Sequence, residues 1–161
     1  MNPKEITQAA EPHILFELAG TTYGIPSRQV RQLEMIQHIT PVPNAPPFVE
    51  GVVFTRGQVI PAIDLRTRFG FEKAPRDLRT RLLVVSHEDR TVGWIVDSAR
   101  EFVHLDPAGI QPPPETLPEA ARRCLRGAVL LGERPVLLID VAAVLAASPA
   151  PAAESQPANQ T

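Results

Sequence analysis

The chain has 161 residues, of which 43% are hydrophobic, and a formal net charge of −2 at pH 7. Domains that bind nucleic acid are usually strongly basic, so this balance argues against that class of partner. The single cysteine, Cys124, cannot form an internal disulfide and gives no sign of an oxidising compartment. The longest apolar run, 136–147, contains Asp140 and is far shorter than the ~20 residues of a membrane helix. We therefore expect a soluble, cytoplasmic protein that neither enters a membrane nor binds nucleic acid.

The N-terminal part of the chain contains short segments of strand character. Phe16 and Leu18 lie on either side of Glu17, the alternation of a half-buried strand. Val30 and Leu33 fall on one side of a short amphipathic turn that the preceding Pro-Ser pair could cap. In order, the sequence predicts a flexible leader over 1–12, strands over 14–19 and 22–25, a helical turn over 28–33 and an extended segment over 33–39.

The stretch 48–66 predicts two strands around a tight turn, and the rest of the chain is organised around it. Most of its apolar residues are β-branched or aromatic, the types that pack well on a pleated sheet. Gly57 can adopt the positive φ that a hairpin turn needs, which places Arg56 at the hairpin tip. Its guanidinium would be free to meet solvent or a partner. Asp64 closes the second strand and can cap a helical turn over 65–69.

The second half of the chain repeats the hairpin pattern. Trp94 is expected on the buried inner face of the second hairpin. Residues 66–81 hold six arginines or lysines against two acids, which indicates either a solvated surface loop or a docking patch for an acidic partner. In order, we expect this connector, a hairpin with strands 82–86 and 91–97, a strand over 101–105, a proline-rich loop over 106–119, a hairpin with strands 127–131 and 135–139, a helix over 141–147 and a disordered tail over 148–161.

Few residues form a pattern that indicates chemistry. Asp64, Asp97 and Asp140 each follow an apolar strand. They could gather into a metal or acid–base site, or Asp64 and Asp140 could cap helices while Asp97 forms a turn. The arginines near Cys124 could lower the pKa of its thiol, but no base or orienting partner stands at a recognisable spacing. The four histidines lie far apart, and no nucleophile elbow or phosphate loop is present. The sequence therefore predicts no catalytic set.

The fold class that these segments favour is mainly β. Apolar residues at helical spacing are scarce, whereas short strand-like runs between Gly, Pro or Asp recur. The three hairpins have a similar build, each with an acid near its close. Two small barrels would remove the free sheet edges that such strands would otherwise leave.

The central stretch also carries a resemblance to a known family. The run Gly51-Val52-Val53, then Arg56-Gly57, Pro61 and Asp64-Leu65-Arg66 is similar to the G-x-x-N-L-R-G-x-x-x-P-x-x-D-L-R run of CheW-type coupling proteins of bacterial chemotaxis. Further segments with matching order and spacing are Tyr23-Gly24-Ile25, Val30-Arg31-Gln32-Leu33, Thr40–Pro46 and Val92–Asp97. The similarity runs from about His13 to Ala147, and the order and spacing of the segments make it specific.

The resemblance implies a fold, a function and a set of contact residues. The fold would be two intertwined five-stranded SH3-like β-barrels with short helices, including a C-terminal one, over residues 13–147. The function would be that of an adaptor without catalytic activity, cofactor or metal. It would couple the cytoplasmic tip of methyl-accepting chemoreceptors to the regulatory domain of a CheA-type histidine kinase, which has the same fold. The partner-binding positions would be Arg56, Gly57, Val30, Gln32, Gly93 and Ala99.

Three positions depart from the family pattern. Phe54-Thr55 stands where Asn-Leu is usual, Gln32 replaces the usual acid, and Ala99 replaces a larger aliphatic residue. The loss of the acid would weaken a charge-assisted contact, so a specialised or non-flagellar pathway fits these changes. The alternative from another class is a small-ligand or metal-dependent β-barrel enzyme that uses Asp64, Asp97 and Asp140.

Overall fold

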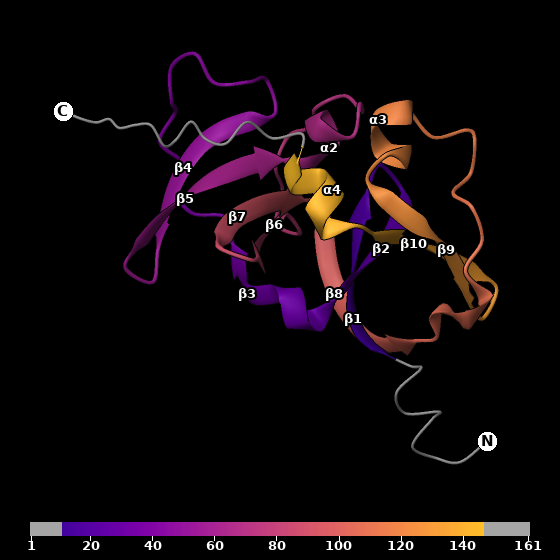
Figure 1. Cartoon of the computed structure of the whole chain (residues 1–161). Helices are drawn as coiled ribbons and strands as arrows, with labels where there is room; N and C mark the ends of the chain where they lie inside the picture. Colours follow the sequence, from indigo (N-terminus) through magenta and orange to yellow (C-terminus); the bar gives the residue numbers. More distant parts are fainter. Residues whose placement is uncertain (1–10, 147–161) are drawn as a thin grey trace.

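The computed structural model describes residues 11–146, which form two five-stranded sheets with short helices between them (Figure 1). The strands are β1 (Glu11–Leu18), β2 (Thr21–Pro26), β3 (Val30–Met35), β4 (Val49–Thr55), β5 (Gln58–Asp64), β6 (Arg81–His87), β7 (Arg90–Val96), β8 (Ser98–Leu105), β9 (Leu125–Leu131) and β10 (Arg134–Ile139). The helices are η1 (Ser27–Gln29), α2 (Leu65–Arg68), η2 (Pro107–Gly109), α3 (Glu119–Arg122) and α4 (Val141–Ala146). None of these helices is long and apolar enough to span a membrane.

The two sheets are interleaved along the chain. The sheet β8-β1-β2-β10-β9 takes strands from both ends of the chain, and we call it the terminal barrel. The sheet β3-β6-β7-β5-β4 is built from the segment between them, and we call it the middle barrel. In Figure 1 the middle barrel lies on the left and the terminal barrel on the right, with α2 and α4 above the junction. The predicted mainly β fold of two intertwined barrels is confirmed.

Two predicted boundaries near the N-terminus are wrong. β1 begins at Glu11, so Glu11 and Pro12 belong to the sheet rather than to the leader, and Glu11 pairs with Leu105 of β8. The helical turn expected over 28–33 ends at Gln29. From Val30 onward the backbone forms a ladder with β6, and these sheet hydrogen bonds replace the helical ones. The leader residues 1–10 and the tail residues 147–161 lie outside the described chain.

The central hairpin has the predicted turn. Arg56 (φ 51°) and Gly57 (φ 77°) are its two loop residues and both have positive φ, as a type I′ turn requires. The sequence indicated this conformation for Gly57 alone. The other two predicted hairpins, β6–β7 and β9–β10, are also present.

Each barrel is closed where a loop meets the first strand of a hairpin. Thr40 and Val52 exchange backbone hydrogen bonds of 2.9 and 2.8 Å in the middle barrel, and Gln111 and Ala128 exchange bonds of 2.8 and 2.7 Å in the terminal barrel. A Cβ on the neighbouring Gly51 would lie 2.1 Å from the Thr40 carbonyl oxygen. The equivalent Gly127 would place a Cβ 2.4 Å from the Gln111 carbonyl oxygen. Only glycine permits these two closures.

The apolar residues form three cores. Each barrel has its own small interior, around Val53 and Ile60 in the middle barrel and around Leu15 and Val136 in the terminal barrel. The largest core lies between the barrels and takes residues from both. Trp94 is fully buried there. The prediction that Trp94 is buried is therefore confirmed, although its indole faces the other barrel rather than the interior of its own.

The two barrels are internal repeats of each other. The pairs β3–β6, β6–β7 and β5–β4 are antiparallel and β7–β5 is parallel, and the same directions recur in β8–β1, β1–β2, β10–β9 and β2–β10. Aligning the registers makes Gly51 equivalent to Gly127 and Asp64 equivalent to Asp140. The turn Arg56-Gly57 then corresponds to Gly132-Glu133. The similar build of the predicted hairpins reflected this repeat.

Candidate functional site

The predicted contact residues Arg56 and Gly57 lie at the exposed end of the middle barrel. Arg56 makes no hydrogen bond or ion pair with any other residue in 11–146. Directly below it, Phe54 and Val59 face each other across β4 and β5, with 65% and 61% of their surfaces exposed. We call Phe54, Arg56 and Val59 the tip surface. The sequence singled out Arg56 but not the two apolar residues. The alternation along β4 could have indicated Phe54, because its side chain points to the opposite side from those of the buried Val53 and Thr55.

Val30, Gln32 and Ala99 flank two β-bulges in equivalent strands. The register of β3 skips Arg31, and the register of β8 skips Arg100. A bulge re-aims the side chains on either side of it. Val30 packs against the core between the barrels, whereas Gln32 reaches Thr55 at the end of the middle barrel. The bulge at Arg31 therefore places Val30 and Gln32 on different surfaces, which the helical turn expected over 28–33 did not indicate.

Gly93 and Ala99 are both buried. Ala99, with 7% of its surface exposed, belongs to the core between the barrels. A Cβ on Gly93 would come within 2.8 Å of Leu82 Cδ1, so this glycine accommodates the packing of the middle barrel. Neither residue presents a side chain to a partner. Each can affect binding only through its packing beneath the surface residues.

Three large apolar side chains are exposed on β3 and β8, one edge strand of each sheet. Leu33 and Met35 of β3 are 43% and 61% exposed, and Phe102 of β8 is 63% exposed. Leu33 lies opposite Leu83 and Phe102 lies opposite Ile14, and both of these partners pack in or against the core between the barrels. Opposite residues of an antiparallel pair point to the same face. We call Leu33, Met35 and Phe102 the seam surface, because they extend the core between the barrels to the exterior.

The end of the middle barrel carries a polar network that the sequence did not predict. Thr55 Oγ1 donates a 2.8 Å hydrogen bond to Glu34 Oε2, and Gln32 Nε2 donates to Thr55 Oγ1 at 3.1 Å and also contacts Glu34. Two of the departures from the family pattern, Gln32 and Thr55, thus bond to each other. Glu34 lies two residues beyond Gln32 on the same strand face, so a carboxylate is kept near the hairpin tip.

Asp64 and Asp140 cap helices, as predicted. Asp64 Oδ1 accepts the Thr67 N–H at 3.4 Å, and Asp140 Oδ1 accepts the Ala143 N–H at 3.2 Å. Burial raises the pKa of Asp64, and the hydrogen bond from the Thr67 backbone opposes that shift. Both carboxylates are therefore occupied by backbone donors at the first turns of α2 and α4.

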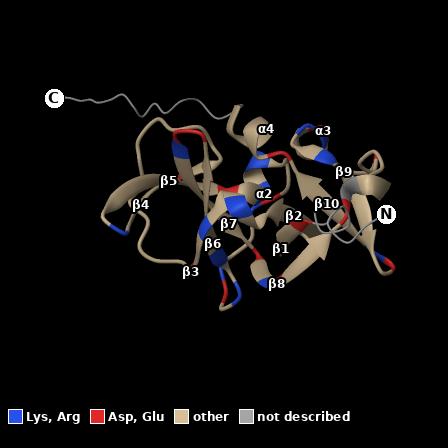
Figure 2. Cartoon of the chain, turned by 60° about the horizontal axis from the view of Figure 1, so that its bottom comes forward, with Lys and Arg blue, Asp and Glu red and all other residues tan. Residues whose placement is uncertain are grey.

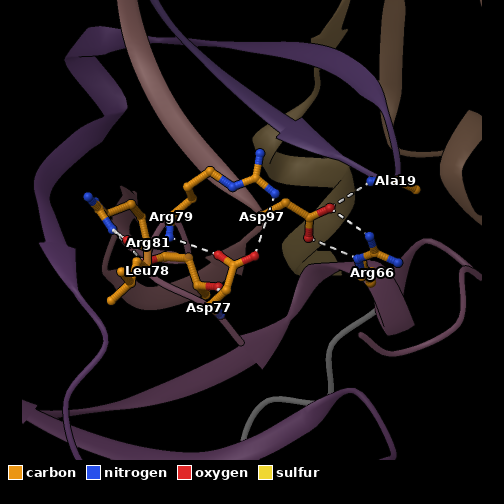
Figure 3. Close-up of polar contacts among 8 residues, drawn as sticks. Ala19, Arg66, Asp77, Leu78, Arg79, Arg81 and Asp97 are labelled. Atoms are coloured by element: carbon orange, nitrogen blue, oxygen red, sulfur yellow. Dashed lines mark hydrogen bonds and ion pairs between the residues drawn. The ribbon is translucent and has the colours of Figure 1, made fainter. Parts of the chain in front are cut away.

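Asp97 does more than form a turn. It is the residue between β7 and β8, and its carboxylate joins both barrels (Figure 3). Arg66 Nε and Nη2 donate bonds of 2.8 and 2.7 Å to the two carboxylate oxygens, and the Ala19 N–H donates a third of 2.9 Å. The hydrogen bond to Asp97 raises the pKa of Arg66. Asp97 and Arg66 lie on different elements that are far apart along the chain, so the sequence alone did not predict that they pair.

The structure does not bring the three aspartates together. Asp64 and Asp97 line one hollow of ≈ 300 Å³, with Arg66 between them, whereas Asp140 lines another. No group of three or more His, Cys, Asp or Glu side chains within 11–146 could hold a metal ion. Burial raises the pKa of Cys124, against the lowering that its arginine neighbours suggested. The arrangement therefore lacks the geometry that a three-aspartate enzyme would need.

The positive charges of the connector are largely paired. Lys73 and Arg76 both bind Glu50, and Arg66 binds Asp97. In the view of Figure 2, basic and acidic positions alternate along the ribbon. The solvated-loop interpretation of 66–81 fits these contacts better than a docking patch for an acidic partner.

Comparisons with known proteins agree on one family. The model of the CheW-like domain matches residues 12–148. Chemotaxis protein CheW of Klebsiella aerogenes is 33% identical over 132 residues, which cover 82% of this chain and 80% of that protein. Chemotaxis protein CheW of Bacillus subtilis is 33% identical over 138 residues, covering 86% and 88%. The crystal structure of scaffolding protein TtCheW from Thermoanaerobacter tengcongensis superposes with a TM-score of 0.73 at 30% identity, covering 81% of this chain and 88% of that one.

Proposed function

The chain belongs to the CheW-like domain family, and we propose that it acts as a non-catalytic adaptor in chemotaxis-type signal transduction in the cytoplasm. It couples the cytoplasmic tip of a chemoreceptor to the regulatory domain of a CheA-type histidine kinase. The departures at Gln32 and Phe54-Thr55 favour a specialised or non-flagellar pathway. An adaptor needs two contact surfaces that can be occupied at the same time, and it needs no catalytic site.

The observation that carries this proposal is the presence of two separate exposed apolar sets. The seam surface continues the core between the barrels, whereas the tip surface lies at the far end of the middle barrel (Figure 1). Exposed apolar residues that cluster are typical of sites that bind other proteins. Leu33 and Gln32 of β3 lie opposite residues of different cores, Leu83 and Val84, so the seam surface and the bond between Gln32 and Thr55 beside the tip use opposite faces of one strand.

We assign the seam surface to the receptor and the tip surface to the kinase. The seam offers apolar side chains from β3 and β8 on either side of the junction, which suits an elongated partner lying along it. The tip surface suits a partner with the same fold. The equivalent tip of the terminal barrel carries exposed Leu130 and Glu133 where the middle barrel carries Phe54 and Gly57. A kinase domain built from the same two barrels can therefore pair with the chain quasi-symmetrically.

Binding of purified partners tests the proposal. The wild-type chain is titrated by calorimetry with a receptor-tip fragment and, separately, with the kinase regulatory domain, and we expect both to bind. The double substitution Leu33→Asp and Phe102→Asp should abolish receptor binding and preserve kinase binding. Val42→Asp is the matched control, because Val42 is 42% exposed and Leu33 is 43% exposed. Failure of the wild-type chain to bind either partner would refute the proposed function.

A further inference from the structure

Two unpaired charges of opposite sign lie at the end of the middle barrel. Among residues 11–146, Glu34 receives hydrogen bonds only from neutral groups, namely Thr55 at 2.8 Å, Gln32, and Gln37 at 3.5 Å. No lysine or arginine in the described part of the chain forms an ion pair with Glu34. Arg56 follows Thr55 directly and has no acidic partner there either. The hydroxyl of Thr55 thus holds the Glu34 carboxylate beside the turn without neutralising it.

The terminal barrel shows that this lack of pairing is particular to one end. Glu101 of β8 is equivalent to Gln32 of β3. Each is the first paired residue after the bulge of its strand, and the strand residue that it pairs with lies in turn opposite a buried glycine. Glu101 binds Arg134 at 3.0 Å, and Arg134 is equivalent to Gln58. The terminal barrel therefore neutralises its own acid across the barrel end. The middle barrel has glutamine at both of these positions and keeps its carboxylate two residues further along.

The apolar neighbours determine what could cover these charges. Phe54 and Val59 are exposed beside Arg56, and Glu34 is bonded to Thr55, the residue between Phe54 and Arg56. A partner that covers the whole end of the barrel would therefore strip water from both Arg56 and Glu34. Removing an unpaired charge from water is costly unless the partner supplies an opposite charge. A partner that covers the tip surface must therefore bring an acid to Arg56 and a base to Glu34. A purely apolar or singly charged partner would be disfavoured.

We propose that Glu34 is a partner-selecting residue, and that with Arg56 it admits a kinase regulatory domain whose contact surface pairs a basic side chain with Glu34 and an acidic one with Arg56. This inference rests on the proposed function. The occupant is the kinase and not the receptor, because Glu34 lies opposite Leu82 on the face of β3 that turns away from the seam surface. Gln32 and Thr55 position the Glu34 carboxylate and do not themselves carry the selectivity.

Neutralising Glu34 tests this proposal without disturbing the fold. In Glu34→Gln the amide oxygen can still accept from Thr55, so the melting temperature should stay close to that of the wild type. Affinity for the kinase regulatory domain should fall about tenfold, and its dependence on salt should weaken, because one ion pair is lost. Affinity for the receptor-tip fragment should not change. Glu115→Gln is the control, because Glu115 is an exposed acid in the loop after β8 with no charged partner in the described chain.

The possible outcomes separate this inference from the proposed function. Unchanged kinase affinity in Glu34→Gln, with a loss in Arg56→Glu, would overturn the role of Glu34 and leave the adaptor function standing. An equal loss of kinase and receptor binding would also overturn it, because the charge would then not select between partners. Charge reversal in Glu34→Lys should weaken kinase binding more than Glu34→Gln does, and a smaller effect would contradict the ion pair.

Discussion

The two barrels are closed and capped in the same way and differ mainly in the residues at their exposed ends. Both close through a glycine next to a two-way backbone bridge, and both finish a hairpin with an aspartate that caps a helix. At the barrel ends the correspondence stops. Glu101 and Arg134 pair with each other in the terminal barrel, whereas Glu34 and Arg56 stay unpaired in the middle barrel. The residues that close the barrels and cap the helices are thus repeated, and residues that differ between the barrel ends mark the surfaces where binding is proposed.

The shared core gives the largest expected effect. Trp94 corresponds to Ile25 in the other barrel, and both are fully buried between the barrels. Trp94→Ala should lower the free energy of unfolding by ~3–5 kcal/mol, measured by chemical denaturation. Because the core belongs to both barrels, unfolding should remain a single transition. Two separate transitions, or a native tryptophan that is readily quenched, would show that the barrels are independent.

The link between Arg66 and Asp97 has no counterpart in the terminal barrel, where α4 has Ala142 at the position of Arg66. Within the described chain, Arg66→Ala leaves the Asp97 carboxylate with only the Ala19 N–H as a donor. The change should cost ~2 kcal/mol, as expected for a lost charged hydrogen-bonded pair that is partly exposed. The control Arg76→Ala removes an exposed ion pair of 3.5 Å and should cost less than ~0.5 kcal/mol. Thermal melts distinguish the two, and similar values for both would mean that the link is an ordinary surface contact.

The helix caps should respond alike in the two barrels. Asp64→Ala and Asp140→Ala should each cost ~1 kcal/mol, because each removes the side-chain acceptor of a first-turn N–H. Asp64→Asn and Asp140→Asn keep an acceptor and should be nearly neutral in the same denaturation assay. An asparagine variant as damaging as the alanine variant would point to a role for the negative charge itself.

The smallest expected effect is a difference in acid sensitivity. His13 is buried in the terminal barrel at the position that Leu82 occupies in the middle barrel, and burial lowers its pKa. The unfolded chain then takes up a proton first, at its ordinary pKa of about 6.5, so stability falls as the pH drops below that value and is unaffected above it. His13→Leu, which gives the terminal barrel the residue of the middle barrel, should remove this component. Identical pH profiles for both proteins between pH 7.5 and 5 would contradict the assignment.

Local signals in the sequence were sufficient for most of the fold. Gly57 indicated the central turn, and Asp64 and Asp140 indicated their helices, because turn and cap chemistry depends on a few adjacent residues. The side of β3 on which Val30 and Gln32 lie could not be predicted, because the bulge at Arg31 depends on pairing with β6, far along the chain. The bonds between Glu34 and Thr55, and between Arg66 and Asp97, likewise join segments that only the closed barrels bring together. The family resemblance supplied the partner classes, and the surfaces assigned to them come from exposure and register.

In the proposed function, one chain holds two partners at once on different surfaces. The decisive experiment is a calorimetric titration of the kinase regulatory domain into the chain already saturated with a receptor-tip fragment. We expect an affinity for the kinase domain that is at least as high as in the absence of receptor, and a ternary complex of all three components in size-exclusion chromatography with light scattering. Displacement of the receptor fragment as the kinase domain binds would contradict it, because the two partners would then share one site.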